Sequence, residues 1–334
     1  MLRSEKGGSD VMNNITIHGI CKALMKNDNF LVFTHENPDA DTIGSCFALI
    51  VTLRLLGKTA YPACCDRIPA SLAFMTEGDR EFHIDNAPAD FTPEYYVSVD
   101  VASTAQFGSY RDYASRIDLS LDHHATHENF SKYYLTDPHA AACAEIVYHV
   151  IDRLLNGKIT EKIASLLYAA LAADTGGFRY ANTTPVTHKI AANLIEKGAS
   201  HAEICRNLFE CKTKTALAAE AFAMANVSYC CGGKISYVTI TKADKQAHGF
   251  EDEDTYDVIN VIRRVDGVKV AIFMREKDDG TFKISTRSAG EIDVSKLCAI
   301  FGGGGHAGAA GCSVTPEMAE SALQRIIKEC GFHE

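Results

Sequence analysis

The stretch Thr34-His-Glu-Asn-Pro-Asp-Ala-Asp-Thr-Ile-Gly-Ser45 decides the fold. It follows the apolar run 30–33, which predicts a buried strand. His35, Asp39 and Asp41 therefore lie at the end of a strand, where open α/β sheets bind ligands. One imidazole and two carboxylates suit divalent ions such as Mn²⁺, which favour oxygen ligands with some nitrogen. One of the two aspartates could instead cap the next helix, but a cap needs one such residue rather than three.

Three later apolar segments also end at an acid or a histidine. These ends carry Asp100, then Asp122, His123 and His124, and finally Asp174. Each alone could be a solvated end of a strand, and Asp174 could be a helix N-cap before Thr175. Because such endings recur four times, we interpret them as one site assembled from several loops on a rigid sheet.

The ordered set His-x3-Asp-x-Asp, Asp, Asp-His-His and Asp-Thr-Gly resembles the DHH phosphoesterase superfamily. Near the C-terminus, Phe301-Gly-Gly-Gly-Gly-His-Ala-Gly-Ala-Ala-Gly311 resembles the glycine-rich signature of the DHH-associated domain. That domain occurs in the branch of nanoRNases and pAp phosphatases. The motifs run from Thr34 to Gly311, so the resemblance covers nearly the whole chain.

The resemblance implies a centre of two Mn²⁺ ions, with Co²⁺ and Mg²⁺ as alternatives. One ion is expected on His35, Asp39 and Asp100, and the other on Asp41, Asp100, His123 and Asp174. Asp100 would bridge them. Two cations about 3.5–4 Å apart can clamp both ends of a phosphoryl displacement. A zinc hydrolase with a single metal is the competing interpretation, but zinc sites have three or four ligands and often use cysteine.

Asp100, Asp122 and His124 are the residues that the resemblance makes catalytic. Asp122 is expected outside the ligand set, where it would orient a histidine ligand. His124 corresponds to the family residue that contacts the substrate phosphate. Whether His124 also protonates the leaving oxygen is left open by the sequence.

The glycine-rich segment formally matches a dinucleotide-binding pattern, which we reject because a helix-like run precedes it and a strand-like run follows it. It could be a loop that ends a helix, or a nest of backbone N–H groups that cradles a phosphate. The resemblance favours the nest, and places a phosphate-clamping arginine in the motif 285–288. The expected substrate-binding residues are Arg287, Ser288, Gly303, Gly304, Gly305 and His306, with Arg179 as a weaker candidate.

A chain of 334 residues is expected to form two domains. Alternating strand-like and helix-like segments predict an α/β fold with a mainly parallel N-terminal sheet. We predict a DHH catalytic domain over 1–187, a helical linker over 188–226, and a smaller C-terminal α/β DHH-associated domain over 227–334. Strands are predicted at 30–35, 59–65, 95–100, 117–121, 132–136, 234–241, 268–274 and 281–287. Asp279–Gly280 predicts a hairpin turn between the last two of these strands. Helices are predicted at 14–27, 42–56, 103–115, 140–156, 159–173, 185–225, 255–265, 294–300 and 315–330. Pro185, Gly198 and Ser200 are predicted boundaries within the nearly continuous helical segment 185–225.

Net charge, cysteine spacing and the lengths of the apolar runs argue against several classes of protein. The formal net charge of −10 argues against a long track for nucleic acid. The twelve cysteines include no C-x-x-C pair, so we expect reduced, buried thiols. The N-terminus does not resemble a signal peptide and no apolar run reaches the length of a membrane helix, so we expect a cytoplasmic, unanchored protein. The oligomeric state is open, with a homodimer as one alternative.

The resemblance implies a Mn²⁺-dependent phosphoesterase with its active site between the two domains. Its expected substrates are short oligoribonucleotides (nanoRNA), degraded 3′→5′ to mononucleotides, and 3′-phosphoadenosine 5′-phosphate. The main alternative is a phosphodiesterase acting on cyclic or linear dinucleotides. An inorganic pyrophosphatase and a non-catalytic nucleotide sensor are lower-ranked alternatives, since the glycine-rich loop and all expected ligands are present.

Overall fold

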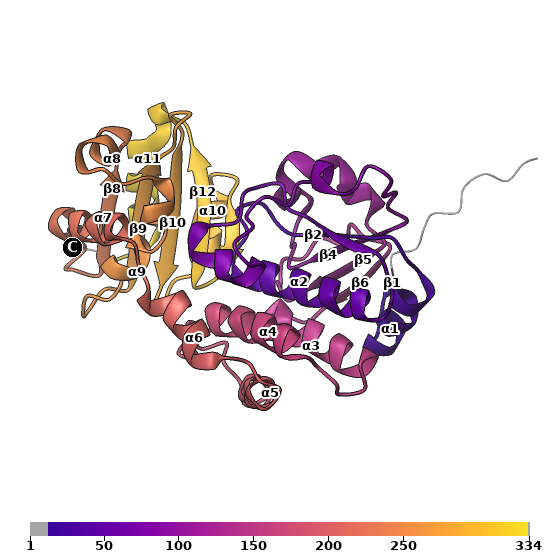
Figure 1. Cartoon of the computed structure of the whole chain (residues 1–334). Coiled ribbons are helices and arrows are strands. Elements are labelled where there is room, and N and C mark those ends of the chain that lie inside the picture. Colours follow the sequence, from indigo (N-terminus) through magenta and orange to yellow (C-terminus); the bar gives the residue numbers. More distant parts are fainter. Residues whose placement is uncertain (1–12, 333–334) are drawn as a thin grey trace, which may run out of the picture. The chain divides into compact units, whose positions relative to one another are not determined.

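The computed structural model describes residues 13–332 and divides the chain into two compact units (Figure 1). Unit 1 ends at Cys211 and unit 2 begins at Lys212. This boundary falls inside the segment 188–226, whose helices are divided between the two units.

Unit 1 is built on a six-stranded sheet in which every neighbouring pair is parallel. Its strand order is β1-β6-β5-β4-β2-β3, so the chain leaves β2 in one direction and returns on its other side at β4. Such a switch point is where open α/β sheets bind ligands. The predicted parallel α/β fold is confirmed. The strands are β1 Asn13–Asn14, β2 Phe30–Phe33, β3 Ala60–Ala63, β4 Tyr95–Val99, β5 Leu119–Asp122 and β6 Tyr133–Thr136.

Both faces of this sheet are covered, which explains why its strands read as continuous apolar runs. One face packs on helices α1 to α4, and Val97, Leu121 and Leu49 belong to that core. The other face packs Phe33 against Phe107 of the 3-10 segment η3. The helical elements are α1 Ile17–Lys26, α2 Ala40–Leu55, η1 Ala70–Thr76, η2 Ile84–Asn86, η3 Thr104–Arg116, α3 Cys143–Leu154, α4 Glu161–Asp174, α5 Pro185–Glu196, α6 His201–Cys205 and the π-helical turn η4 Arg206–Glu210.

Two predicted helices are wrong in detail. The segment 103–115 is not an α-helix but the 3-10 element η3, broken at Gly108 with φ of 54°. A Cβ at Gly108 would lie 2.8 Å from Sγ of Cys65, so only glycine fits there without a shift. In the nearly continuous helix predicted over 185–225, the boundary at Gly198 is confirmed, because its φ of 97° ends α5. The prediction missed the break between η4 and α7, where residues 211–213 are not helical.

Unit 2 contains a second six-stranded sheet, in the order β11-β12-β10-β9-β8-β7. Its pairs are antiparallel except β8 with β9. The predicted hairpin turn at Asp279–Gly280 is confirmed, because β9 and β10 pair antiparallel around Gly280, whose φ is 83°. The strands are β7 Ser228–Cys230, β8 Ile235–Ile240, β9 Val270–Glu276, β10 Phe282–Ser288, β11 Gly304–His306 and β12 Ala309–Val314.

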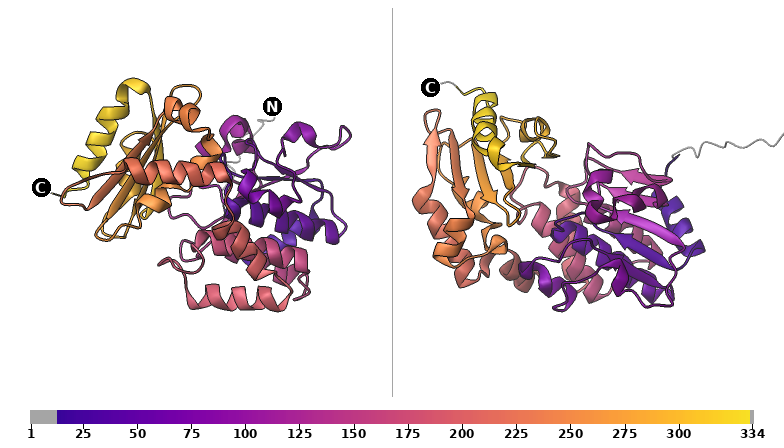
Figure 2. Two further views of the ribbon diagram at one scale, coloured as in Figure 1. Left: turned by 60° about the vertical axis from the view of Figure 1, so that its left-hand side comes forward. Right: turned by 90° about the horizontal axis from the view of Figure 1, so that it is seen from above.

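Helices cover both faces of the second sheet (Figure 2). Each face carries a separate hydrophobic core. Ile284 and Ile326 belong to the core under α10 and α11, and Phe273 and Ile259 to the core under α7 and α9. The helical elements are α7 Lys214–Asn226, α8 Lys242–His248, η5 Asp252–Thr255, α9 Val258–Ile262, α10 Val294–Ala299, η6 Pro316–Met318 and α11 Ala319–Glu329.

The glycine-rich segment ends helix α10 and then forms a strand. The amides of Gly302 and Gly303 donate to the carbonyls of Ala299 and Cys298, which ends α10. Strand β11 follows and pairs with β12 as a hairpin. The amide of Gly303 is therefore already bonded to the backbone of α10. The phosphate nest expected from the resemblance stays a prediction.

All twelve cysteines are free thiols, as expected. The expectation that they are buried is wrong for Cys211, which is exposed, and Cys65, Cys205 and Cys230 are only partly buried. Within residues 13–332, no helix is both long and apolar enough to cross a membrane.

Candidate metal centre

The ends of three neighbouring parallel strands gather the predicted ligands at one edge of the first sheet. Parallel strands bring their carboxyl ends to the same edge, so residues far apart in sequence meet there. The last residue of helix α4 adds one more acid. The residues that meet are His35 and Asp39 after β2, Asp100 after β4, Asp122, His123 and His124 at the end of β5, Asp41 in the first turn of α2, and Asp174 of α4.

Asp39 has the capping role that the sequence left open between two aspartates. Its Oδ1 accepts hydrogen bonds from the amides of Asp41 and Thr42, at 2.9 and 3.1 Å, and so caps α2. The same oxygen lies 3.7 Å from Nε2 of His35. The capping hydrogen bonds therefore fix the Asp39 side chain in a position beside His35.

Asp41 is anchored by the first turn of a different helix. Its side chain is buried, and its Oδ2 accepts from the amide of Cys143 at 2.6 Å. Its Oδ1 accepts from the amide of Ala144 at 3.0 Å and from the hydroxyl of Ser45 at 3.1 Å. Burial, and then the charges of Asp100 and Asp174, raise the pKa of Asp41 well above its ordinary value. A cation beside this carboxylate would relieve that repulsion.

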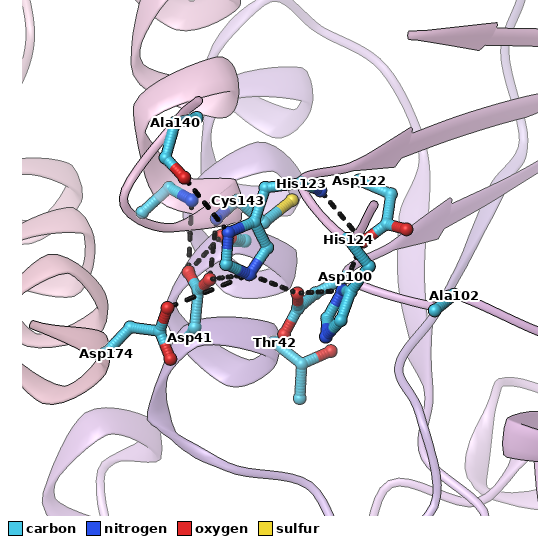
Figure 3. A network of polar contacts seen from close by, with 12 residues as sticks. Asp41, Thr42, Asp100, Ala102, Asp122, His123, His124, Ala140, Cys143 and Asp174 are labelled. Carbon is cyan, nitrogen blue, oxygen red and sulfur yellow. Dashed lines mark hydrogen bonds and ion pairs between the residues drawn. The ribbon is translucent and has the colours of Figure 1, made fainter. Parts of the chain in front are cut away.

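Asp100 lies at the centre of the cluster. It has a left-handed backbone, with φ of 60°, which aspartate tolerates better than most residues. Its amide donates to the carbonyl of Leu121 at 2.9 Å, so the turn is tied to β5. Its Oδ2 lies 3.6 Å from Nε2 of His35. Its Oδ1 lies on the side of His123, 3.5 Å from Nε2 of that ring (Figure 3). Within residues 13–332, this buried Oδ1 has no hydrogen-bond partner. A buried acceptor without a donor fits a metal ligand.

Two imidazoles are oriented for metal binding by backbone carbonyls. Nδ1 of His35 lies 2.7 Å from the carbonyl of Glu36, and Nδ1 of His123 lies 3.2 Å from that of Ala140. A carbonyl only accepts, so each Nδ1 carries a hydrogen, and each Nε2, which faces the carboxylates, is the nitrogen that a metal ion would bind in place of a proton. This is the arrangement in which histidine binds a metal ion.

Asp174 is the last residue of α4, so the alternative that it caps the start of a helix is wrong. Its Oδ2 lies 3.7 Å from Nε2 of His123. Burial raises the pKa of Asp174 to about 7, against the opposing charge of His123. Three groups in unit 1 have side-chain atoms close enough together to hold an ion, and all three contain Asp100. Two match the expected ligand sets: His35, Asp39 and Asp100, and Asp41, Asp100 and His123, with Asp174 beside the second. The third consists of Asp100, Asp122 and His124.

Asp122 is fully buried and binds two histidine rings. Its Oδ1 lies 2.7 Å from Nδ1 of His124, and its Oδ2 lies 2.8 Å from Nδ1 of His127. The expected ligand His123 contacts Asp122 through its backbone, because the His123 amide donates to Oδ1 of Asp122 at 2.9 Å. The orienting role expected of Asp122 therefore falls on His124. His127 is not among the predicted site residues, although it stands five residues after an acid that ends a strand.

The predicted substrate-binding residues have local contacts. Nη1 of Arg287, on β10, donates to the carbonyl of Thr286 at 3.0 Å. The hydroxyl of Ser288 accepts from the amides of Gly290 and Ile292 at 3.1 and 3.3 Å, so Ser288 stabilises the turn after β10. The guanidinium of Arg179, in unit 1, lies 5.8 Å from the ring centroid of Phe209.

Known proteins match both units. The profile described as the DHH family, N-terminal domain, matches residues 29–171, and the DHHA1 domain matches residues 232–331. The bifunctional oligoribonuclease and PAP phosphatase NrnA of Thermus thermophilus is 30% identical, over 89% of this chain and 87% of its own length. The chain belongs to the DHH family. The protein of the same description from Bacillus subtilis is 26% identical, over 94% of this chain and 99% of its own length.

A solved structure shows the same fold as this DHH-family chain. An exopolyphosphatase-related protein from Bacteroides fragilis superposes with a TM-score of 0.84 at 22% identity. The superposition covers 94% of this chain and 95% of the other. The resemblance to the DHH superfamily and the DHH-associated domain, drawn from the motifs, is therefore confirmed.

Proposed function

We propose that this chain is a Mn²⁺-dependent, two-metal phosphoesterase. It degrades short oligoribonucleotides to mononucleotides and removes the 3′-phosphate from 3′-phosphoadenosine 5′-phosphate. The observation that carries the proposal is the division of Asp100, whose two oxygens face two different histidine-containing groups. Membership of the DHH family and the names of the two NrnA relatives support the choice of reaction and substrates.

In this proposal His35, Asp39 and Asp100 hold one ion. Asp41, Asp100, His123 and Asp174 hold the other. Divalent cations at these positions would supply the positive charge that a phosphate ester needs when another oxygen attacks it. Aspartate oxygens and imidazole nitrogens, without any thiolate, suit Mn²⁺ better than zinc.

His124 contacts the reacting phosphate in this proposal. Its Nδ1 donates to Asp122, so we assign the contact with the substrate to its Nε2. The Asp122 carboxylate fixes the tautomer and the direction of the ring, and stabilises the positive ring when Nε2 carries a proton. A protonated Nε2 would donate to a phosphate oxygen or to the leaving oxygen.

Unit 2 binds the part of the substrate beyond the scissile bond. We assign this role to Arg287 and to the hairpin residues Gly304–His306, with Arg179 of unit 1 as a further cation. A guanidinium binds phosphate through parallel hydrogen bonds. The net charge of −10 disfavours a long track for nucleic acid, which supports a preference for substrates of a few nucleotides.

One assay tests the proposal. The purified chain is incubated separately with Mn²⁺, Co²⁺ and Mg²⁺ and offered a ribodinucleotide, a 24-mer, 3′-phosphoadenosine 5′-phosphate, a cyclic dinucleotide and pyrophosphate. We expect the highest kcat/KM with Mn²⁺, on the dinucleotide and on 3′-phosphoadenosine 5′-phosphate. If the cyclic dinucleotide or pyrophosphate is hydrolysed faster, that compound is the substrate and the proposed substrates are wrong. Equal rates on the 2-mer and the 24-mer would contradict the proposed preference for short substrates.

A further inference from the structure

His127 donates a hydrogen bond to the second oxygen of the Asp122 carboxylate. Oδ1 of Asp122 accepts from Nδ1 of His124 and from the amide of His123, whereas Oδ2 accepts from Nδ1 of His127 at 2.8 Å. Among the described residues, His127 is the hydrogen-bond donor to Oδ2. The carboxylate is thus held between two imidazoles, one on each oxygen.

His127 has a fixed position. Its amide donates to the carbonyl of His124 at 3.2 Å, and the amide of the next residue, Glu128, donates to the carbonyl of Ala102 at 2.7 Å. Its side chain is 3% exposed, and its ring centroid lies 5.3 Å from that of Phe130 and 6.1 Å from that of Tyr134. The imidazole therefore has little room to leave Asp122.

Packing alone does not explain a histidine at this position. Nε2 of His127 is buried and has no hydrogen-bond partner within residues 13–332. Burying a polar atom without a partner typically costs about 1–3 kcal/mol. A phenylalanine would fill the same aromatic surroundings without that cost. Histidine differs from phenylalanine by the hydrogen-bond donor on Nδ1. A carboxylate only accepts hydrogen bonds, so the Nδ1 atoms of His124 and His127 must both carry hydrogen.

Loss of this donor would affect the other side of the carboxylate. Asp122 is fully buried, so Oδ2 could not replace the lost hydrogen bond with bulk water. The carboxyl group would then gain by rotating its unsatisfied oxygen toward the donors that Oδ1 now binds. Rotation of this kind displaces the His124 ring.

We propose that His127 is a positioning residue. It holds the Asp122 carboxylate in the orientation that keeps Oδ1 on Nδ1 of His124, and so directs Nε2 of His124 at the reacting phosphate. The structural part of this inference stands on the hydrogen bonds alone, whereas its effect on turnover rests on the proposed function.

The variants follow from the atoms involved. In His127→Asn, the amide nitrogen can take the place of Nδ1 and donate to Oδ2. In His127→Phe, a ring of similar size remains without a donor. His149→Phe provides a matched control, because this exposed histidine lies on α3 and contacts Tyr148 rather than Asp122.

The first measurement does not require activity. In the Mg²⁺-loaded full chain, with ¹⁵N-labelled histidine, we expect two slowly exchanging, downfield Nδ1–H protons, from His124 and His127. The His127 signal should vanish in both variants. The His124 signal should persist in His127→Asn and broaden or disappear in His127→Phe. An unchanged His124 signal in His127→Phe, or a wild-type spectrum without the His127 proton, would overturn the proposal.

The second measurement is turnover of a ribodinucleotide. We expect His127→Phe to lower kcat by about 10- to 100-fold, with metal content and KM within about twofold of wild type. His127→Asn should recover kcat to within about threefold, and His149→Phe should match wild type. A folded His127→Phe with wild-type kcat, or a His127→Asn no better than His127→Phe, would show a packing role. If His127→Phe does not fold, the proposal is tested by the kcat and the His124 signal of His127→Asn and by the His127 proton in the wild-type spectrum. If wild type hydrolyses no phosphoester, the proposed function fails while the spectra still test the position of His124.

Discussion

Asp100 faces two histidines through different oxygens, with Oδ2 3.6 Å from Nε2 of His35 and Oδ1 3.5 Å from Nε2 of His123. A carboxylate shared in this way can bridge two ions, and its loss removes a ligand from both. We therefore predict that Asp100→Ala lowers the metal content below two ions per chain and reduces kcat by orders of magnitude.

The measurement is metal content by elemental analysis together with turnover of a dinucleotide. Asp100→Asn provides the control for shape, because it keeps the volume and one oxygen but not the charge. It should also lose turnover, with an unfolding temperature close to that of wild type. Near-normal turnover of Asp100→Ala with full metal occupancy would eliminate the two-metal assignment.

Asp174 should make the metal-free protein less stable as the pH rises. Its pKa is raised from 3.8 to about 7 in the fold, first of all by burial, so between these values the folded chain holds a proton that the unfolded chain has released. The free energy of unfolding must then fall with rising pH across this range, and the loss is complete above about pH 7. In EDTA, wild type should lose more thermal stability between pH 5 and pH 8 than Asp174→Asn does.

A difference on the order of 1 kcal/mol corresponds to roughly 2–4 °C for a protein of this size. Scanning calorimetry of both proteins in EDTA measures it. Addition of Mn²⁺ at pH 8 should raise the unfolding temperature of wild type far more than that of Asp174→Asn, because an ion that binds only the folded chain stabilises it. Parallel pH curves for the two proteins would show that Asp174 ionises normally.

The strands that position the site were predictable because they are buried on both faces. All residues of β2 and β4 are buried, so each strand appears in the sequence as a continuous apolar run with a polar residue at its end. The sequence therefore located the ligands that follow those strands. It could not show the left-handed backbone of Asp100 or the hydrogen bonds of Asp41 to α3, because both depend on contacts distant in sequence.

The short strands were missed for a related reason. β1 consists of Asn13–Asn14 and β11 of Gly304–His306, and neither has an apolar pattern. Both are edge strands whose existence depends on pairing with β6 or β12. His127 was missed because its role comes from the turn that brings its ring back to Asp122.

The glycines of the hairpin should differ sharply in their tolerance of a side chain. A Cβ at Gly303 would lie 2.1 Å from the carbonyl oxygen of Gly311 on β12, whereas a Cβ at Gly304 would meet nothing within 4 Å. Gly303→Ala must therefore displace the backbone of the hairpin, at a cost of about 1–3 kcal/mol. Gly304→Ala should unfold at nearly the wild-type temperature. Equal unfolding temperatures for the two variants would show that the hairpin is free to move away from β12.

Arg287 tests the division of labour between the two units. It lies on β10 of unit 2, and a dinucleotide carries negative charge beyond the scissile bond that a guanidinium would bind. Loss of a charge-assisted hydrogen bond typically costs about 1.5–3 kcal/mol, which is roughly 10- to 150-fold. Arg287→Ala should lower kcat/KM for a dinucleotide by that factor and leave the metal content unchanged.

A minimal substrate separates binding from chemistry in this variant. Bis-p-nitrophenyl phosphate contains one phosphate and no nucleoside, so it lacks the group that Arg287 is proposed to bind. Its hydrolysis should therefore be nearly the same in Arg287→Ala as in wild type. Lys283→Ala is a matched control, since it removes another cation of the same strand four residues earlier. If both substrates lose activity equally in Arg287→Ala, or if metal is lost, Arg287 supports the fold of unit 2 and does not bind substrate.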